Sequence, residues 1–306
     1  MKTYRITLNI QSAFGTPLMG DTLFGQLCWA IVHRFGESRL NALLEGYDNQ
    51  QPFAVVSDAL PQNHLPLPTL PSRFWQEGGG KDRKKLKKKQ WIEVKDTQQA
   101  VTLWQQSAKA EKEIFAKENR EQPHNTLNRL TASTGKDEFA PYVMSQIWYK
   151  PSTLLDIYIV IDETRISLEE ITALLTDIGT FGYGRDASIG LGKFSIEQTE
   201  AFDYTKANAN AYLTLANCAP QDLGLNKERC FYQITTRFGR HGSLAVFSGN
   251  PFKKPIILTK LGAVFTPNKW EEKLFIGNGL TGVSYGQTNA VHQGYAPVIP
   301  LSIHFE

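Results

Sequence analysis

Two strand-like segments of this chain are each followed by a helix with one apolar face and then by a further strand, and this repeat restricts the possible folds. Within the helical segments, apolar residues recur every three or four positions. The strands are expected at 4–10, 52–60, 152–162 and 193–200, and the helices at 21–35 and 167–178. The order β-α-β, insertion, β-α-β is typical of the ferredoxin-like fold.

The ends of the helices carry recognisable signals. Asp21 places a negative charge at the positive start of the first helix, and Gly36 suits a left-handed residue after its end. A short second helix is expected at 38–44. Ser167 and Glu170 form an S-x-x-E capping box, which predicts where the later helix begins.

Residues 61–150 interrupt the pattern. Three prolines in HLPLPTLP predict an extended connector, which a glycine-rich basic stretch follows, and 98–118 could form an amphipathic helix. Insertions of this length are usually functional or disordered. We therefore predict an insertion between strands rather than part of a domain core.

The second half of the chain is rich in strands and poor in helical periodicity. Candidate strands lie at 211–219, 230–238, 254–265 and 297–306. A length of 306 residues suits about two domains. We predict an α+β protein with two ferredoxin-like domains of the RRM type: residues 1–200, which contain the insertion at about 61–150, and a degenerate copy at 201–306.

Positive charge is concentrated in one segment. The chain carries +3 overall, yet Lys81–Lys89 (KDRKKLKKK) carries +6, so the rest is net negative. A basic run in a flexible segment suits capture of a polyanion. A solvated loop that serves solubility would have the same composition. The candidate RNA contacts here are Lys84, Lys85, Lys87 and Lys88.

Other features bear on location and cofactors. No stretch approaches about 18 apolar residues, and the start MKTYRITLNI lacks the apolar region of a signal peptide. We expect a cytoplasmic protein that does not contact membranes. The three cysteines form no C-x-x-C pair, and none of the six histidines has metal-site spacing. We therefore expect no metal and no cofactor.

A glycine-rich loop, FGYGRDASIGLG at 181–192, joins the later helix to the strand after it. Glycines permit positive φ and let backbone N–H groups approach a phosphate, and nearby cations could add hydrogen bonds. A helix cap and turn that only redirects the chain is the alternative. The candidate RNA contacts are Gly182, Gly184, Arg185, Asp186, Ser188, Gly190, Gly192 and Lys193.

Two other motifs bear on catalysis. Gly282–Gly286 matches the nucleophile-elbow pattern G-x-S-x-G, but the residues after it oppose the helix that this mechanism needs, which disfavours a hydrolase. In the insertion, His124, Asn125, Asn128 and Arg129 group polar side chains that suit RNA. His124 could contact RNA, act as a general acid in metal-free RNA cleavage, or lie in a plain loop.

Exposed aromatic side chains could stack on unpaired bases. Trp75, Trp91, Trp104 and Trp148 lie in or near the insertion and could do so, or could be buried anchors. Periodicity does not distinguish these possibilities.

The run Gly15–Ala30 (GTPLMGDTLFGQLCWA) resembles the opening of the fourth Csm subunit family of type III-A CRISPR–Cas complexes, a branch of the RAMP superfamily. That family carries G-T-P-L-x-G-D-T-L-F-G-x-x-C-W-A there. Weaker resemblances lie at 44–47, 52–59, 124–135, 182–192 and 293–297. Two departures are Ala132, where the family has glycine, and the basic insertion, which has no counterpart.

The resemblance implies a non-catalytic subunit with two RRM-type domains. It would hold the 5′ handle of the crRNA, and it would bridge the large polymerase/cyclase subunit and the first Csm-type backbone subunit. Target RNA would be met only through the complex. The alternatives are a metal-independent RAMP endoribonuclease that processes precursor crRNA, and a free-standing RNA-binding protein.

The working hypothesis gives each motif a role. The turn at 16–22 and the glycine loop would form a cleft for the handle phosphates, His124–Arg129 would act as a thumb, and the basic run would steer the polyanion. The candidate contacts in the turn are Thr16, Pro17, Met19, Gly20, Asp21 and Thr22.

Overall fold

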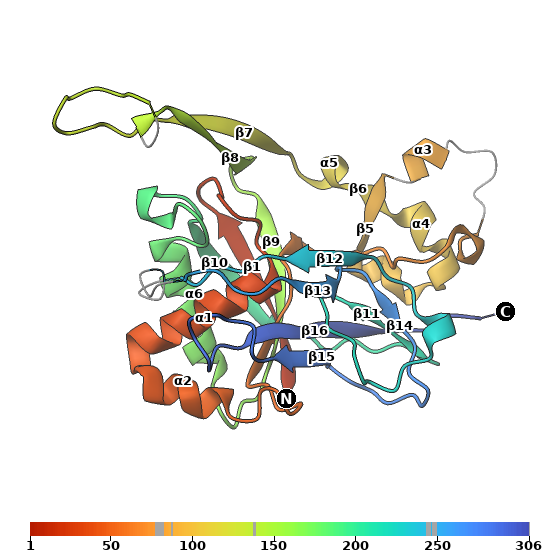
Figure 1. Ribbon diagram of the computed structural model, residues 1–306. Coiled ribbons are helices and arrows are strands. Elements are labelled where there is room, and N and C mark those ends of the chain that lie inside the picture. Colours follow the sequence, from red (N-terminus) through yellow and green to blue (C-terminus); the bar gives the residue numbers. More distant parts are fainter. Residues whose placement is uncertain (77–82, 87, 137–138, 243–245, 247–249, 306) are drawn as a thin grey trace.

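The computed structural model describes residues 1–76, 83–86, 88–136, 139–242, 246 and 250–305 (Figure 1). The first half is built on a five-stranded sheet with the order β10-β1-β9-β2, in which β3 also pairs with β9, always antiparallel. The strands are β1 (Lys2–Ile10), β2 (Ala54–Val56), β3 (Leu60–Pro61), β9 (Leu154–Ile161) and β10 (Phe194–Ala201). The predicted strand at 52–60 is thus two short strands.

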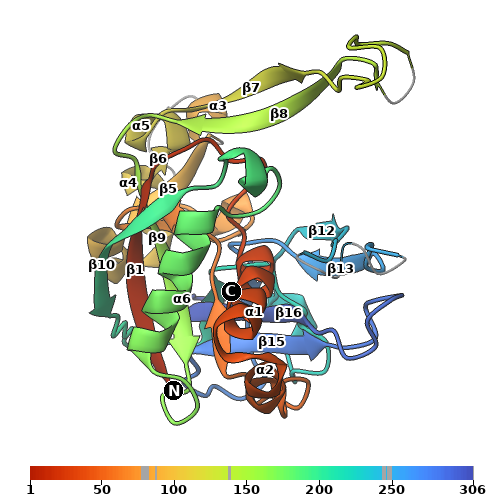
Figure 2. The ribbon, with the colours of Figure 1, turned by 90° about the vertical axis from the view of Figure 1, so that its left-hand side faces the viewer.

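Two helices pack side by side against this sheet, α1 (Gly20–Phe35) and α6 (Leu168–Phe181) (Figure 2). Their predicted apolar faces enter one core with the strands, although Phe35 lies outside it and is exposed. The capping box is confirmed, since Ser167 accepts from the Glu170 amide and the Glu170 carboxylate accepts from the Ser167 amide. Gly36 has the expected positive φ, 86°, before α2 (Glu37–Leu44).

The second half contains a four-stranded sheet with the order β14-β11-β16-β15. Its strands are β11 (Ala211–Thr214), β14 (Val264–Phe265), β15 (Phe275–Leu280) and β16 (His292–Leu301). A separate antiparallel pair consists of β12 (Ile234–Arg237) and β13 (Ile256–Thr259). After residue 201, the described part of the chain has a 3-10 turn at Lys227–Arg229 and no α-helix.

The insertion was only partly anticipated. It begins with a three-stranded sheet of β4 (His64–Pro66), β5 (Lys89–Glu93) and β6 (Lys109–Ala110). The predicted helix at 98–118 is wrong, because this segment consists of short turns around buried Trp104. The short elements in and next to this segment are α4 (Trp104–Ser107), α5 (Glu111–Ile114) and 3-10 turns at Val94–Gln98 and Val101–Leu103. Two further short elements precede them in the insertion, α3 (Arg83–Leu86) and a 3-10 turn at Ser72–Phe74.

The first part of the insertion also belongs to a core, which corrects the expectation that it lies outside one. Leu65, Ile92 and Trp104 are fully buried in a cluster with Leu213 and Ile299 of the second sheet. This packing removes from water apolar side chains of both the insertion and the second sheet.

The rest of the insertion is a long hairpin of β7 (Lys117–His124) and β8 (Tyr142–Tyr149). Figures 1 and 2 show that it extends away from the body of the molecule. Most of its side chains are exposed.

The two halves are joined by buried contacts. The Gln293 side chain on β16 accepts from the Val56 amide (2.9 Å) and donates to the Val56 carbonyl (2.7 Å). Tyr295 of β16 lies within the core of the first half.

No described helix is both long enough and apolar enough to cross a lipid bilayer.

Candidate nucleic-acid interface

The glycine loop lies directly against the turn that precedes α1. The Tyr183 hydroxyl donates to the Pro17 carbonyl (2.8 Å) and accepts from the Met19 amide (3.2 Å). The Arg185 amide donates to Thr16 Oγ1 (3.0 Å). Tyr183 is fully buried, which anchors the loop. The structure therefore brings together the two segments that sequence placed on either side of one cleft.

The glycines of the loop have different reasons for being glycine. All four have positive φ, but a Cβ on Gly192 would lie 2.1 Å from the Tyr183 carbonyl oxygen, and one on Gly184 would lie 2.8 Å from Thr16 Cβ. A Cβ on Gly190 would meet open space. Close packing therefore explains Gly192 and Gly184, and only Gly190 lies on an open rim.

The exposed rim of the loop is formed by Arg185, Ser188 and Ile189. Arg185 also makes internal contacts, since Nη2 donates to the Ser145 carbonyl on β8 (2.5 Å) and Nε to the Asp186 carboxylate (3.1 Å). It therefore braces the root of the hairpin against the loop.

Lys193 has a structural contact too. Its ammonium donates to the Thr180 carbonyl (2.8 Å) in the last turn of α6, where a cation stabilises unpaired carbonyls. Both Arg185 and Lys193 are therefore held by contacts within the chain.

Two residues of the turn are interior rather than surface. Gly20 is buried, and its amide donates to the Asp58 carboxylate (2.8 Å). Asp21 is buried, and its carboxylate accepts from Arg237 Nε (2.6 Å) and Nη2 (2.8 Å). Gly20 and Asp21, both predicted RNA contacts, are thus interior residues that join α1 to neighbouring segments. Arg237 Nη2 also donates to Thr22 Oγ1 (3.0 Å).

The two buried carboxyls near the start of α1 have opposite pKa shifts. Burial raises the pKa of Asp58 to about 7, although the Gly20 amide works against this. Burial acts the same way on Asp21, but His292 and Arg237 outweigh it and hold its pKa well below the usual range. His292 Nε2 lies 3.5 Å from the Asp21 carboxylate. Arg237 was not among the predicted site residues, because no local pattern links it to a residue 216 positions earlier.

The predicted thumb residues lie at the far end of the hairpin. His124 ends β7 and stacks on Tyr142 of β8, with ring centroids 5.4 Å apart. Asn125 and Arg129 are exposed, and Asn128 bridges to Ser133. The tip lies apart from the glycine loop in both views (Figures 1 and 2), so this group is a separate surface.

The basic run is also apart from the glycine loop. Lys85 and Lys88 are exposed beside α3, at the opposite end of the molecule's upper edge from the hairpin tip (Figure 1). Lys87 and the side chain of Lys84 lie outside the described residues.

Of the four tryptophans considered for base stacking, Trp104 is fully buried and Trp148 is exposed. Trp148 lies under the Arg120 guanidinium, 4.8 Å from the ring centroid. Trp75 and Trp91 pack against the second core.

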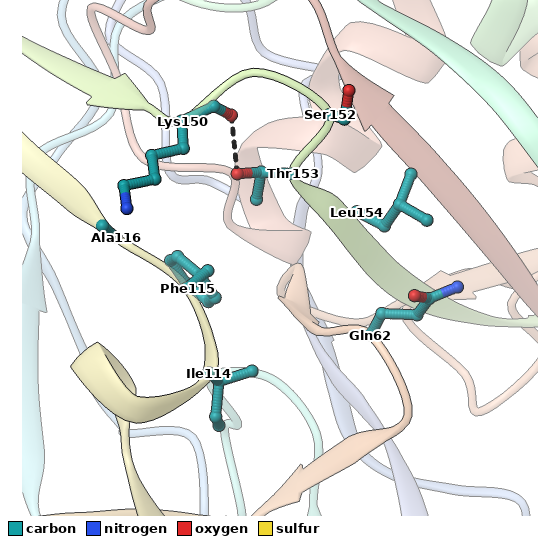
Figure 3. A pocket seen from close by; sticks show the side chains of 8 residues that line it. All are labelled: Gln62, Ile114, Phe115, Ala116, Lys150, Ser152, Thr153 and Leu154. Atoms are coloured by element: carbon teal, nitrogen blue, oxygen red, sulfur yellow. Dashed lines mark hydrogen bonds between the residues drawn. The ribbon is translucent and has the colours of Figure 1, made fainter.

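Two neighbouring cavities lie where the hairpin joins the body, about 340 and 630 Å³ in volume. Figure 3 shows the smaller one, in which the Thr153 hydroxyl donates to the Lys150 carbonyl (2.7 Å). Its lining residues are Gln62, Ile114, Phe115, Ala116, Lys150, Ser152, Thr153 and Leu154. Neither cavity is lined by the glycine loop or by residues 16–22.

The G-x-S-x-G motif forms a turn between β15 and β16, with no helix after it. Ser284 Oγ lies 2.7 Å from His241 Nε2 and accepts from the amides of Gly286 and Gln287. Ser284 and His241 are 9% and 8% exposed. The serine therefore stabilises a turn, and its oxygen already accepts hydrogen bonds from two amides.

In the described part of the chain, no three His, Cys, Asp or Glu side chains gather as metal ligands would.

Comparison with known proteins yields matches in structure alone. No family model and no curated protein matches the sequence. A chain of the Csm1–Csm4 cassette in complex with pppApA superposes with a TM-score of 0.59 and 16% identity, over 100% of this chain and 99% of that one. The cassette in complex with cA4 gives 0.59 and 15%, over 99% of each chain.

A chain of the Csm3–Csm4 subcomplex of the type III-A CRISPR–Cas interference complex gives a TM-score of 0.58 and 15% identity, over 95% of this chain and 99% of that one. Csm4 is the subunit that these assemblies have in common. At such low identity the similarity establishes the fold and not the activity. The chain therefore shares its mixed α+β architecture with antiparallel sheets, over its whole length, with the chains matched in these assemblies.

Proposed function

We propose that this chain is the Csm4-type subunit of a type III-A CRISPR effector complex and that it holds the 5′ handle of the crRNA without catalysing a reaction. The observation that carries the proposal is the Csm4 fold over the whole chain, together with a glycine loop packed on the turn before α1. The fold supports the assignment to a complex, and the loop supports a surface for phosphates.

The same proposal covers partners and domains. We assign a contact with a large polymerase/cyclase subunit and with a backbone subunit, because the matched chains come from Csm1–Csm4 and Csm3–Csm4 assemblies. Target RNA would be met through the complex, in the cytoplasm.

We also propose two ferredoxin-like domains, 1–200 and 201–306. The strand order β10-β1-β9-β2 supports the first, whereas the second would have lost its helices within the described residues.

The enzymatic alternative, processing of precursor crRNA with His124 as acid or base, has less support. Among the described residues, Nε2 of His124 is buried without a hydrogen-bond partner, and the ring stacks on Tyr142. A proton donor must reach the reacting oxygen. We expect precursor processing to be unchanged in His124→Ala.

The deciding experiment is purification of the tagged chain from its host, with sequencing of the bound RNA. We expect partner proteins and an RNA of defined length with a constant 5′ end. Ser188→Glu places a negative charge on the exposed rim of the glycine loop, and it should weaken handle binding about tenfold or more because a phosphate would be repelled there.

Thr176→Glu is the matched control, since it adds the same charge to an exposed position of α6 before the loop. Recovery of the chain without RNA, or equal handle binding by both variants, would contradict the proposal.

A further inference from the structure

The β12–β13 pair has one face turned to the body and one turned to solvent. Within β12, the exposed Ile234 and Thr236 alternate with the less exposed Thr235 and Arg237. Alternate residues of a strand share a face, so Ile234 and Thr236 point outward together. Tyr232, Phe238 and Arg240, which flank the strand, are exposed as well, and Phe238 is 77% exposed.

The neighbouring strand extends this surface. Ile257 lies directly opposite Thr236, and Phe252 lies opposite Arg240, whose guanidinium is 5.8 Å from the Phe252 ring centroid. Beside them, the Lys254 ammonium lies 5.7 Å from the Tyr285 ring centroid. We call this surface the outer face; it consists of Tyr232, Ile234, Phe238, Arg240, Phe252, Lys254, Ile257 and Tyr285.

The inner face explains why these aromatic side chains remain outside. Arg237 points to the buried Asp21 at the start of α1, and Leu258 is buried. Because side chains alternate, anchoring Arg237 inward holds Phe238 outward. The buried ion pair thus helps to fix which face of β12 turns to the body.

The charged side chains in the segment that contains most of the outer face, residues 229–270, are all positive. Residues 229–270 contain seven Lys and Arg and no Asp or Glu. Exposed rings interleaved with cations, and without carboxylates, suit the π-faces and phosphates of an unpaired nucleic acid. Aromatic side chains and Arg are also enriched in protein-docking faces, whereas Lys is depleted there, so Lys254 is the residue that favours RNA.

We propose that the outer face is a second RNA-binding surface, distinct from the glycine loop, which holds an unpaired strand by stacking bases on Phe238 and Phe252 while Arg240 and Lys254 contact phosphates. The proposal rests on the proposed RNA-binding role of this chain and adds a surface with no sequence preference, because every base has a π-face. In Figure 2 the β12–β13 pair and the β7–β8 hairpin extend to the same side of the molecule.

The test measures binding of the full-length protein to a fluorescent oligouridine of about twelve nucleotides, by anisotropy. The double variant Phe238→Leu/Phe252→Leu keeps apolar side chains but removes the rings, and it should bind at least about tenfold more weakly. The double variant Phe238→Trp/Phe252→Trp should bind within about threefold of wild type, because it restores stacking. Phe35→Leu, at an exposed ring that ends α1, is the matched control and should bind as wild type does.

Charge gives a second measurement. Arg240→Gln should reduce the slope of log affinity against log salt by about 0.7, as loss of one phosphate contact to a single strand requires. Equal oligouridine binding by wild type and the leucine variant would overturn the inference. So would a leucine variant that binds oligouridine normally but loses a partner subunit, because the face would then dock protein.

The two proposals fail in different ways. If wild type binds neither oligouridine nor handle RNA, the proposed function fails. If Ser188→Glu loses handle RNA while the leucine variant keeps oligouridine, the second surface alone is overturned.

Discussion

At the scale of single residues, the cluster at the start of α1 contains two buried carboxyls whose pKa values are shifted in opposite directions. Asp58 accepts one amide and is buried, whereas Asp21 has a guanidinium and His292 beside it. The motif that resembles the Csm4 opening includes Asp21, yet the structure uses this carboxylate to join α1 to β12 through Arg237.

The pKa of Asp58 predicts a pH dependence of stability. Because burial raises this pKa to about 7 from an ordinary value of 3.8, the folded protein binds more protons than the unfolded chain between these values. The contribution of Asp58 to the free energy of unfolding therefore falls as pH rises through this window. Asp58→Asn should lose less stability than wild type between about pH 5 and about pH 8, as measured by urea denaturation.

Asp48→Asn is the control, since it removes an exposed carboxylate from the same half of the molecule. Its pH profile should parallel that of wild type. An Asp58→Asn profile parallel to wild type would show that Asp58 stays ionised in the fold.

At the scale of elements, the loop after α6 combines two functions that sequence could not separate. Four glycines predicted a phosphate site or a turn, and the structure contains features of both. Gly192 is required by packing on Tyr183, whereas Gly190 borders open space.

This difference predicts unequal effects of alanine. Gly190→Ala should cost about 1 kcal/mol of unfolding free energy, from positive φ alone. Gly192→Ala adds a clash with the Tyr183 backbone and should cost more than about 3 kcal/mol. Chemical denaturation of both variants tests this, and equal losses would contradict the packing argument.

At the scale of the whole molecule, the two sheets share their cores. Trp104 of the insertion packs with the second sheet, Tyr295 of β16 lies in the first core, and Gln293 bonds both polar groups of Val56. The halves therefore support each other, although each sheet is drawn from its own part of the sequence.

We therefore expect one cooperative unfolding transition. Gln293→Leu leaves the buried amide and carbonyl of Val56 unpaired, and it should lower the free energy of unfolding by about 2–4 kcal/mol. Near- and far-ultraviolet circular dichroism should report the same shifted midpoint. Gln221→Leu, at an exposed glutamine, should stay within about 0.5 kcal/mol of wild type. Separate transitions for the two signals would contradict shared cores.

Local patterns were enough to place the regular elements of the first half. The strand at 4–10, the helix at 21–35 and the capping box at Ser167 depend on neighbours within a few positions, and all are present. The strand Phe275–Leu280 was missed because its two glycines break the pattern that identifies strands. The helix at 98–118 was wrong because burial of Trp104 outweighs helical periodicity.

The sequence by itself determined the strands and helices of the first half outside the insertion, the glycine loop, and the turn on which it packs, because propensity and periodicity act over a few residues. Only the tertiary structure decided that Asp21 is an internal anchor for Arg237, that part of the insertion completes a core, and that the rings flanking β12 and β13 face solvent. Those outcomes depend on which distant segments exclude water from one another, and no local pattern encodes that choice.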